Sequence, residues 1–86
     1  MGEELVSVCI PAYNSGRFIV RTIESILNQT YKNIEIVIVD DCSSDDTVDK
    51  VKSIKDDRIK LIVNEANLGM SRNWDKCIRS CSGRYV

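Results

Sequence analysis

The spacing of apolar residues changes several times along the chain, and each change predicts a new element. An apolar, β-rich run at 5–10 predicts a first strand, which Pro11 is expected to end. Residues 17–30 carry apolar side chains at helical spacing, with Asn14 or Ser15 as the expected cap. The start of the chain therefore predicts a strand, a turn and a helix.

The middle of the chain repeats this alternation. Its most apolar stretch, 34–39, predicts a strand that is buried on both faces, as in a parallel sheet. Residues 43–57 predict a short helix capped by Ser43 or Ser44, and residues 58–64 predict a third strand.

The C-terminal part predicts one more helix and the start of a fourth strand. Apolar side chains in 70–82 recur at helical spacing, Gly83 is typical of a helix end, and 84–86 begin another apolar run. Strands that alternate with helices are typical of right-handed crossovers and a parallel sheet. We therefore expect an α/β, Rossmann-like half-domain of three layers, with a mostly parallel sheet in the strand order 3-2-1(-4).

The apolar stripes of the predicted helices also predict which side chains form the core. Trp74 lies at helical spacing with its apolar neighbours, which favours packing in the core over a role as a ligand platform. The apolar positions of the first helix are Phe18, Ile19, Ile23, Ile26 and Leu27. Of these we expect Phe18, Ile23, Ile26 and Leu27 in the core.

The composition of the 86-residue chain suits one domain, or part of one, and limits its partners. It has 12 basic and 13 acidic residues and a net charge of −1, whereas a nucleic-acid-binding domain normally needs a basic face. No apolar run approaches the roughly 20 residues that span a bilayer. We expect no nucleic-acid partner, no transmembrane segment and a cytoplasmic location.

The four cysteines, Cys9, Cys42, Cys77 and Cys81, form no C-x-x-C pair, and the chain has no histidine. A zinc site is therefore poorly supported. Cys77 and Cys81 are one helical turn apart, where two thiols could meet a metal or oxidise. Buried cysteine behaves as a small hydrophobe, so we expect all four to be reduced residues in or near the core.

Polar side chains follow the first two predicted strands at the point where each strand ends. Tyr13 and Asn14 follow the first strand, and Asp40 and Asp41 follow the second. Because the carboxyl ends of neighbouring parallel strands meet at one edge, we expect these side chains to converge there. Tyr13 can stack on a base for about 1–3 kcal/mol, or it can pack on the first strand as an ordinary turn aromatic. Asp40 can accept a hydrogen bond from a base N–H for about 1.5–3 kcal/mol.

The acidic residues at this edge allow more than one interpretation. They would repel the phosphates of a nucleotide unless a hard cation such as Mg²⁺ lay between them. An acidic pair on a loop can also simply be solvated. Asp45 and Asp46 are better explained as charges at the N-terminus of the second helix, where the helix dipole favours them, than as metal ligands.

Several linked motifs connect these features to a known family. From about Val6 to Val86 the chain closely resembles the start of family 2 glycosyltransferases of the GT-A fold. The motifs occur in the family's order: P-x-Y-N at 11–14, S-I-L-x-Q-T-Y at 25–31, E-I-V-I-V-D-D-x-S-x-D-x-T at 35–47, N-x-G at 67–69, R-N at 72–73 and G-R-Y-V at 83–86.

The resemblance implies a nucleotide-sugar-binding half-domain, with a UDP-sugar as the expected ligand. The P-x-Y-N segment and the first aspartate of the D-D pair would hold the nucleoside, and the segment at 67–73 would approach the nucleotide. Within that segment Arg72 could offset phosphate charge or contact the edge of the base. The implied binding residues are Pro11, Ala12, Tyr13, Asn14, Asp40, Asp41 and Arg72.

The chain also departs from the family pattern. The D-D pair is often followed by glycine, whereas Cys42 stands here and has to fit a tight turn. The family's metal-binding Asp-x-Asp and its catalytic base are expected after Val86. The resemblance therefore implies that 1–86 is a truncated N-terminal nucleotide-binding part, with no catalytic or metal-binding residue of its own.

The resemblance further implies the activity of the parent enzyme. It would be an inverting transferase that uses Mg²⁺ or Mn²⁺ to move a sugar to an acceptor hydroxyl, in polysaccharide or glycoconjugate synthesis. The parent could work at the inner face of the membrane, and this chain alone would be inactive. A half-sheet also leaves an unpaired edge, which predicts self-association.

A non-catalytic, receiver-like signalling or binding module is the alternative, because an acidic pair after a buried strand suits it. It is disfavoured because Val63 and Asn64 occupy the tip of the third strand, where the receiver pattern has another acidic residue. A dinucleotide-binding Rossmann domain is rejected because the first turn, 11–16, contains no G-x-G-x-x-G.

Overall fold

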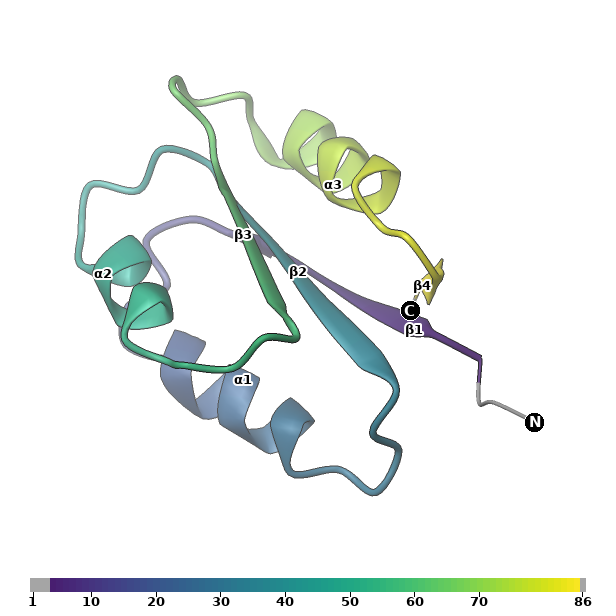
Figure 1. The fold of residues 1–86 in the computed structure, drawn as a ribbon. Coiled ribbons are helices and arrows are strands. Elements are labelled where there is room, and N and C mark those ends of the chain that lie inside the picture. Colours follow the sequence, from purple (N-terminus) through teal and green to yellow (C-terminus); the bar gives the residue numbers. More distant parts are fainter. Residues whose placement is uncertain (1–3, 86) are drawn as a thin grey trace.

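A computed structural model describes residues 4–85, in which strands and helices alternate along the chain (Figure 1). Each predicted strand and helix is present, and their order is the predicted one. The elements are β1 (Val6–Ala12), α1 (Ile19–Leu27), β2 (Ile34–Asp40), α2 (Thr47–Lys52), β3 (Ile59–Val63), α3 (Met70–Arg79) and β4 (Arg84–Tyr85).

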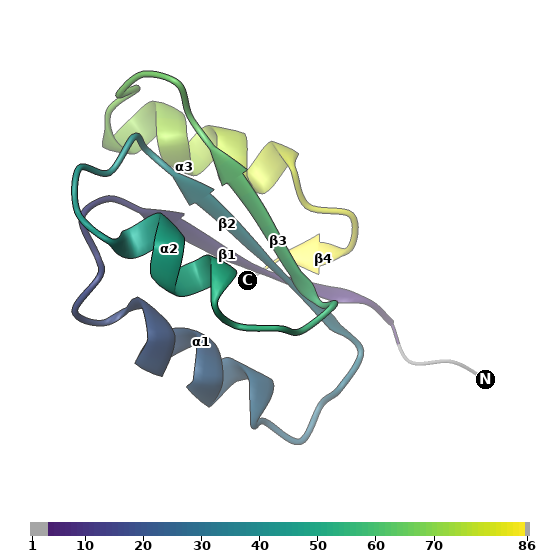
Figure 2. The same cartoon turned by 60° about the vertical axis from the view of Figure 1, so that its left-hand side comes forward.

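The strands form one parallel sheet in the order β3-β2-β1-β4. Helices α1 and α2 lie on one face of the sheet and α3 lies on the other (Figure 2). The three layers and the strand order are those predicted from the sequence. Because β1 and β2 are parallel neighbours, the loops that follow them leave the sheet at the same edge.

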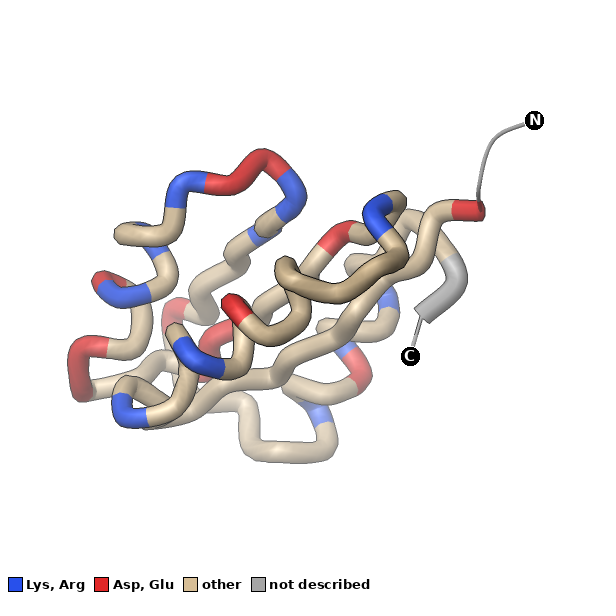
Figure 3. The backbone as a smooth tube through the Cα atoms, turned by 90° about the horizontal axis from the view of Figure 1, so that it is seen from below, with Lys and Arg blue, Asp and Glu red and all other residues tan. Residues whose placement is uncertain are grey.

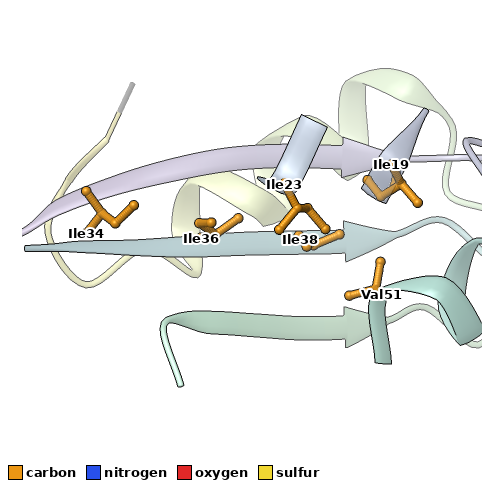
Figure 4. Packing of buried hydrophobic residues seen from close by; sticks show 7 residues of the cluster. Ile19, Ile23, Ile34, Ile36, Ile38 and Val51 are labelled. Carbon is orange, nitrogen blue, oxygen red and sulfur yellow. The ribbon is translucent and has the colours of Figure 1, made fainter. Parts of the chain in front are cut away.

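Strand β2 is the centre of the core, and its side chains alternate between the two helical layers. Its isoleucines pack on the side of α1 and α2, with Ile23 and Val51 above them (Figure 4). Its valines pack on the other face with Cys77 of α3. The predicted burial on both faces is confirmed, because each of these side chains is at most 8% exposed: Ile34, Ile36, Ile38, Val37 and Val39.

Strand β1 does not end at Pro11, as predicted, but continues to Ala12. Pro11 is in register with Val39 of β2. On the other side of β1, the described residues of β4 pair with Val6 and Ser7. Within residues 4–85 no strand pairs with Pro11 on that side, and a strand tolerates the missing N–H of proline where no partner needs it.

The helices are shorter than predicted, and the predicted caps are wrong. Phe18 is the N-cap residue of α1 and makes no side-chain cap; its N–H donates instead to the Ser15 carbonyl at 2.9 Å. Helix α2 begins after Asp46 rather than at Ser43 or Ser44. Both serine side chains form hydrogen bonds between loops, so the chain cannot enter a helix there.

Two aromatic residues predicted for the core are largely exposed, Phe18 by 65% and Trp74 by 47%. The rest of the α1 stripe is confirmed: Ile23 is fully buried, and Ile26 and Leu27 pack partly buried against the same cluster. Phe18 precedes the first turn of α1, so it lies outside the helical register that the prediction assumed.

Charged residues of both signs occur throughout the described chain. Basic and acidic positions are interspersed along the described chain instead of the basic ones gathering on one face (Figure 3). Within residues 4–85, none of the helices is both long and apolar enough to cross a membrane.

Candidate functional site

A cavity of about 620 Å³ lies where the chain leaves β1 and β2. This volume falls in the range of roughly 300–1,000 Å³ that is usual for small-molecule sites. The last residues of β1, Pro11 and Ala12, line it, as do Tyr13 and Ser15 from the following loop. Asp41, directly after β2, also lines the cavity. Tyr13 is 53% exposed, so the cavity is open to solvent on that side.

The opposite wall comes from α3 and the loop that precedes it. Asn67 and Gly69 contribute from the loop, and Met70, Asn73 and Trp74 from the first turns of the helix. Met70 and Trp74 are one helical turn apart, so their apolar side chains share a helix face. The cavity therefore has an aromatic residue on each of two elements that are distant in sequence.

Asp41 is held firmly at this cavity and is only 3% exposed. Its Oδ1 accepts the Leu68 N–H at 2.7 Å and the Asn64 amide at 3.0 Å, and its Oδ2 accepts the Gly69 N–H at 3.0 Å. Burial alone would raise the pKa of Asp41, but these three donors, together with the charge of Lys76, lower it below its ordinary value. An ionised carboxylate offers about four acceptor positions, so Oδ2 can accept one more donor.

A buried polar network fixes the orientation of Asp41. Asn64 uses one amide hydrogen on Asp41 and the other on Asn73 Oδ1 at 2.8 Å, while its own Oδ1 accepts Lys76 Nζ at 2.7 Å. The Asn73 amide in turn donates to the Val39 carbonyl at 2.9 Å. Because each amide is satisfied, the network orders the site without an unpaired polar group.

Asp40 has a different environment from its neighbour. Its side chain is fully buried, and it does not line the cavity. Its carboxylate accepts the Ser43 N–H at 2.8 Å and the Ser43 hydroxyl at 2.5 Å. Asp40 therefore shapes the turn after β2.

Hydrogen bonds tie the loop after β1 to the loop after β2. Asn14 Oδ1 accepts the Ser44 N–H at 2.9 Å. Asn14 and Cys42 both adopt left-handed backbone conformations, with φ of 48° and 60°, which turn the two loops toward each other. Three successive backbone N–H groups also donate across to the second loop and the start of α2. Asn14 donates to Ser43 Oγ at 2.8 Å, Ser15 to Thr47 Oγ1 at 2.8 Å, and Gly16 to Asp45 Oδ2 at 3.1 Å.

The structure divides the residues that the sequence predicted for nucleotide binding into two groups. Asn14 connects the two loops, Asp40 holds the turn after β2, and Arg72 is exposed on α3 and does not line the cavity. Sequence reasoning missed Ser15, Met70 and Trp74. The helical spacing of Met70 and Trp74 placed them on one face but did not tell which face borders the cavity. The predicted residues that line the cavity are Pro11, Ala12, Tyr13 and Asp41.

The residues described here do not fit a metal site. Within residues 4–85, no three side chains of histidine, cysteine, aspartate or glutamate come together in a way that could hold an ion. The acidic pair after β2 is used for hydrogen bonds inside the protein, as described above. No step of the chemistry is therefore assigned to a metal held by these residues.

Comparison with solved structures supports the fold. The mannosyltransferase PcManGT from Pyrobaculum calidifontis, solved with GDP-Man and Mn²⁺, superposes with a TM-score of 0.83 at 25% identity over 95% of this chain and 26% of that one. Residues 1–349 of S. aureus TarS, solved with UDP, give a TM-score of 0.82 at 28% identity over 94% of this chain and 26% of that one.

Curated relatives are similar along nearly the whole chain. The Escherichia coli UDP-Glc:alpha-D-GlcNAc-diphosphoundecaprenol beta-1,3-glucosyltransferase WfaP is 48% identical over 96% of this chain, and WfgD, of the same printed activity and organism, is 41% identical over 100%. The chain spans 33% and 34% of their lengths. These similarities give no support to the receiver-like alternative. The family model described as "Glycosyl transferase family 2" matches residues 7–86, and the chain belongs to that family, with the GT-A fold that its motifs predict.

Proposed function

We propose that this chain is the nucleotide-binding part of a glycosyltransferase and that its cavity holds the nucleoside of a nucleotide-sugar donor. The observation that carries the proposal is a cavity that combines exposed aromatic residues with a firmly held carboxylate, Asp41. It lies at the carboxyl ends of the strands, where parallel α/β sheets bind ligands. The names of the relatives, with UDP-Glc for WfaP and UDP for TarS, support a uridine nucleotide.

Each part of the cavity suits a pyrimidine base. Tyr13 and Trp74 offer faces for stacking, for about 1–3 kcal/mol per base. Asp41, when ionised, only accepts hydrogen bonds, so the base has to present a donor. The N3–H of uracil is such a donor, whereas N3 of cytosine is an acceptor and the donor of cytosine is its N4 amino group beside N3. We assign the base contact to Asp41 instead of Asp40, and we expect UDP to bind more tightly than CDP.

For the parent enzyme we propose hexosyl transfer to an acceptor hydroxyl by single displacement, with inversion and with a general base outside these residues. The leaving diphosphate would be stabilised by Mg²⁺ or Mn²⁺, whose ligands we expect beyond Val86. The diphosphoundecaprenol in the names of WfaP and WfgD supports a lipid-linked acceptor and a cytoplasmic protein at the inner face of the membrane. The chain alone should bind nucleotide without transferring sugar.

Titration with UDP tests this proposal. Binding is detected by calorimetry and by the intrinsic fluorescence of the chain. Trp74 is the only tryptophan in the chain, so a bound base should change its emission. We expect Tyr13→Ala and Asp41→Asn each to weaken UDP binding by about tenfold or more, because each removes a contact worth about 1.5 kcal/mol. Asp40→Asn should act through folding stability more than through affinity.

Phe18→Ala is the matched control, because Phe18 is an exposed aromatic residue that does not line the cavity. It should leave UDP binding unchanged. Equal affinity of the Tyr13→Ala variant and the unmodified chain for UDP would contradict the proposed site. Equal affinity for UDP and CDP would contradict the assigned role of Asp41.

A further inference from the structure

Two cysteines that are far apart in sequence meet on the α3 face of the sheet. Cys9 lies in β1, and Cys81 lies just beyond the end of α3. Their Sγ atoms are 3.1 Å apart, although 72 positions separate them in the chain. Both thiols are free and half-buried.

The third thiol in this region, Cys77, also interacts with Cys9. It is fully buried, and its Sγ donates to the Val37 carbonyl at 3.3 Å. The Cys81 thiol donates to the Cys77 carbonyl at 3.3 Å, which places it over the last turn of α3 and facing β1. The direct contact of 3.1 Å between the Sγ atoms of Cys9 and Cys81 favours Cys81 over Cys77 as the partner of Cys9.

The two sulfur atoms need only a small movement to form a bond. A disulfide requires an S–S distance of about 2.05 Å, roughly 1 Å less than the present separation. The half of β1 near Cys9 is held by pairing with β2, so it cannot shift easily. Cys81 lies in the connection between α3 and β4, where a change of rotamer and a small loop shift can close the gap.

We propose that Cys9 and Cys81 form a thiol–disulfide site that a small-molecule disulfide oxidises to an internal cross-link between β1 and the C-terminal end of α3. One thiolate attacks a sulfur of the reagent, forms a mixed disulfide and releases one reagent thiol. The second protein thiolate then attacks the protein sulfur of that mixed disulfide and releases the second reagent thiol. In total the protein loses two protons and two electrons, and the reagent disulfide takes them up as it becomes two thiols.

The environment of the pair makes this reaction slow at neutral pH. Burial, reinforced by the contact with Cys9, raises the pKa of Cys81 to about 11, and burial also raises the pKa of Cys9. Among the described residues, Cys77 raises the pKa of Cys9, and Glu35 raises the pKa of both thiols. Lys60 places a positive charge at the Ser80 carbonyl, one residue before Cys81. Because the thiolate is the attacking species, the rate should rise with pH through the mildly alkaline range.

The cross-link should stabilise the fold without blocking the nucleotide cavity. Cys81 lies at the opposite end of α3 from Met70 and Gly69, which line that cavity. A covalent bond between residues this distant removes much of the chain entropy of the unfolded state. We expect the thermal unfolding midpoint to rise by at least about 5 °C, with UDP affinity changed by less than about twofold.

The test uses the 86-residue chain with Cys42→Ser, which removes the exposed thiol that would otherwise react first. After incubation with oxidised glutathione at mildly alkaline pH, intact-mass measurement should show a loss of two hydrogen atoms without added glutathione. Peptide mapping should locate the bond between Cys9 and Cys81. Adding Cys81→Ser should abolish the cross-link, whereas adding Cys77→Ser should preserve it.

Three results would overturn the proposal. They are a stable glutathione adduct without ring closure, a bond that maps to Cys77, and a protein that stays reduced under conditions that oxidise an unfolded control. Mapping in the Cys42→Ser chain alone is decisive even if Cys77→Ser does not fold. Failure of UDP binding in the unoxidised chain would contradict the nucleotide proposal but would leave the thiol site untouched.

Discussion

At the residue scale, Cys42 occupies a backbone conformation that glycine would adopt more easily. Its φ is 60°, and a side chain in the left-handed region costs about 1–2 kcal/mol, while glycine adds roughly 0.5–1 kcal/mol of unfolded-state entropy. We expect Cys42→Gly to raise the free energy of unfolding by up to about 1 kcal/mol. Cys42→Val should lower it by about 1 kcal/mol or more, because β-branched residues tolerate this region least. Urea denaturation measures both changes.

Cys42→Ala separates the backbone effect from the loss of the thiol, whose contact with the Glu65 carbonyl is long at 3.7 Å. The alanine variant keeps the same left-handed conformation, so its stability should resemble that of the unmodified chain. A glycine variant less stable than the alanine variant would rule out strain at this position.

Asp41 should make the stability of the fold sensitive to acid. Its pKa in the folded chain is lowered, so the carboxylate contributes stability above its unfolded pKa and loses it as pH falls through the folded value. We expect urea midpoints to fall below about pH 4, and to fall less steeply for Asp41→Asn. That variant should also be less stable at neutral pH, because an amide nitrogen would face N–H donors.

Asp57→Asn is the control, since Asp57 is exposed. It should leave the urea midpoint at neutral pH, and the fall of that midpoint below about pH 4, nearly unchanged. If the acid limb of Asp41→Asn were as steep as that of the unmodified chain, the hydrogen bonds to Asp41 would not be the source of its pKa shift.

At the scale of the elements, α1 is attached to the sheet by its inner stripe and not by Phe18. Ile23 is fully buried on β2, whereas Phe18 is 65% exposed. Removing a buried isoleucine side chain costs about 2–5 kcal/mol, and an exposed substitution usually costs less than about 0.5 kcal/mol. We expect Ile23→Ala to lower the free energy of unfolding by the larger amount and Phe18→Ala by the smaller. Similar losses for the two variants would show that α1 packs in another register.

The order and type of these elements could be predicted because apolar periodicity is a local signal, and the buried run in β2 is unmistakable. Their boundaries could not, because long-range contacts set them. Helix α2 begins late since Ser43 is bonded to Asp40 and Asn14, which are outside the helix. β1 passes Pro11 because its pairing with β2 continues to Ala12, a long-range contact that local propensity does not contain.

The sequence predicted both neighbouring carboxylates, Asp40 and Asp41, at this edge of the sheet, and of the two only Asp41 lines the cavity. Strand alternation explains the difference. Even-numbered residues of β2 face α1 and α2, and odd-numbered ones face α3. Asp41 continues the α3 side, where Asn64 and Asn73 meet it, whereas Asp40 lies with Ser43. The alternation of side chains along β2 could be predicted from the sequence. The face of the sheet on which α3 packs could not.

At the scale of the whole molecule, the edges of the sheet decide how the chain behaves at high concentration. Strand β3 is an edge strand, and Val63 at its end is 46% exposed. An edge strand leaves backbone N–H and C=O groups free to pair with another chain, and charge along the edge opposes this. Lys60 gives β3 some protection, but its Nζ donates to the Ser80 carbonyl, which draws it toward α3. We therefore expect concentration-dependent self-association through β3.

Val63→Lys tests this, because it places a charge on the edge without removing a buried side chain. Sedimentation velocity over a concentration series should show weaker association for this variant, with an unchanged urea midpoint. Gln29→Lys, at an exposed position after α1, adds the same charge outside β3 and should associate like the unmodified chain. If both lysine variants lost association equally, net charge would be the cause and the β3 edge would not. A chain that stays monomeric throughout the series would show that β3 is protected as it stands.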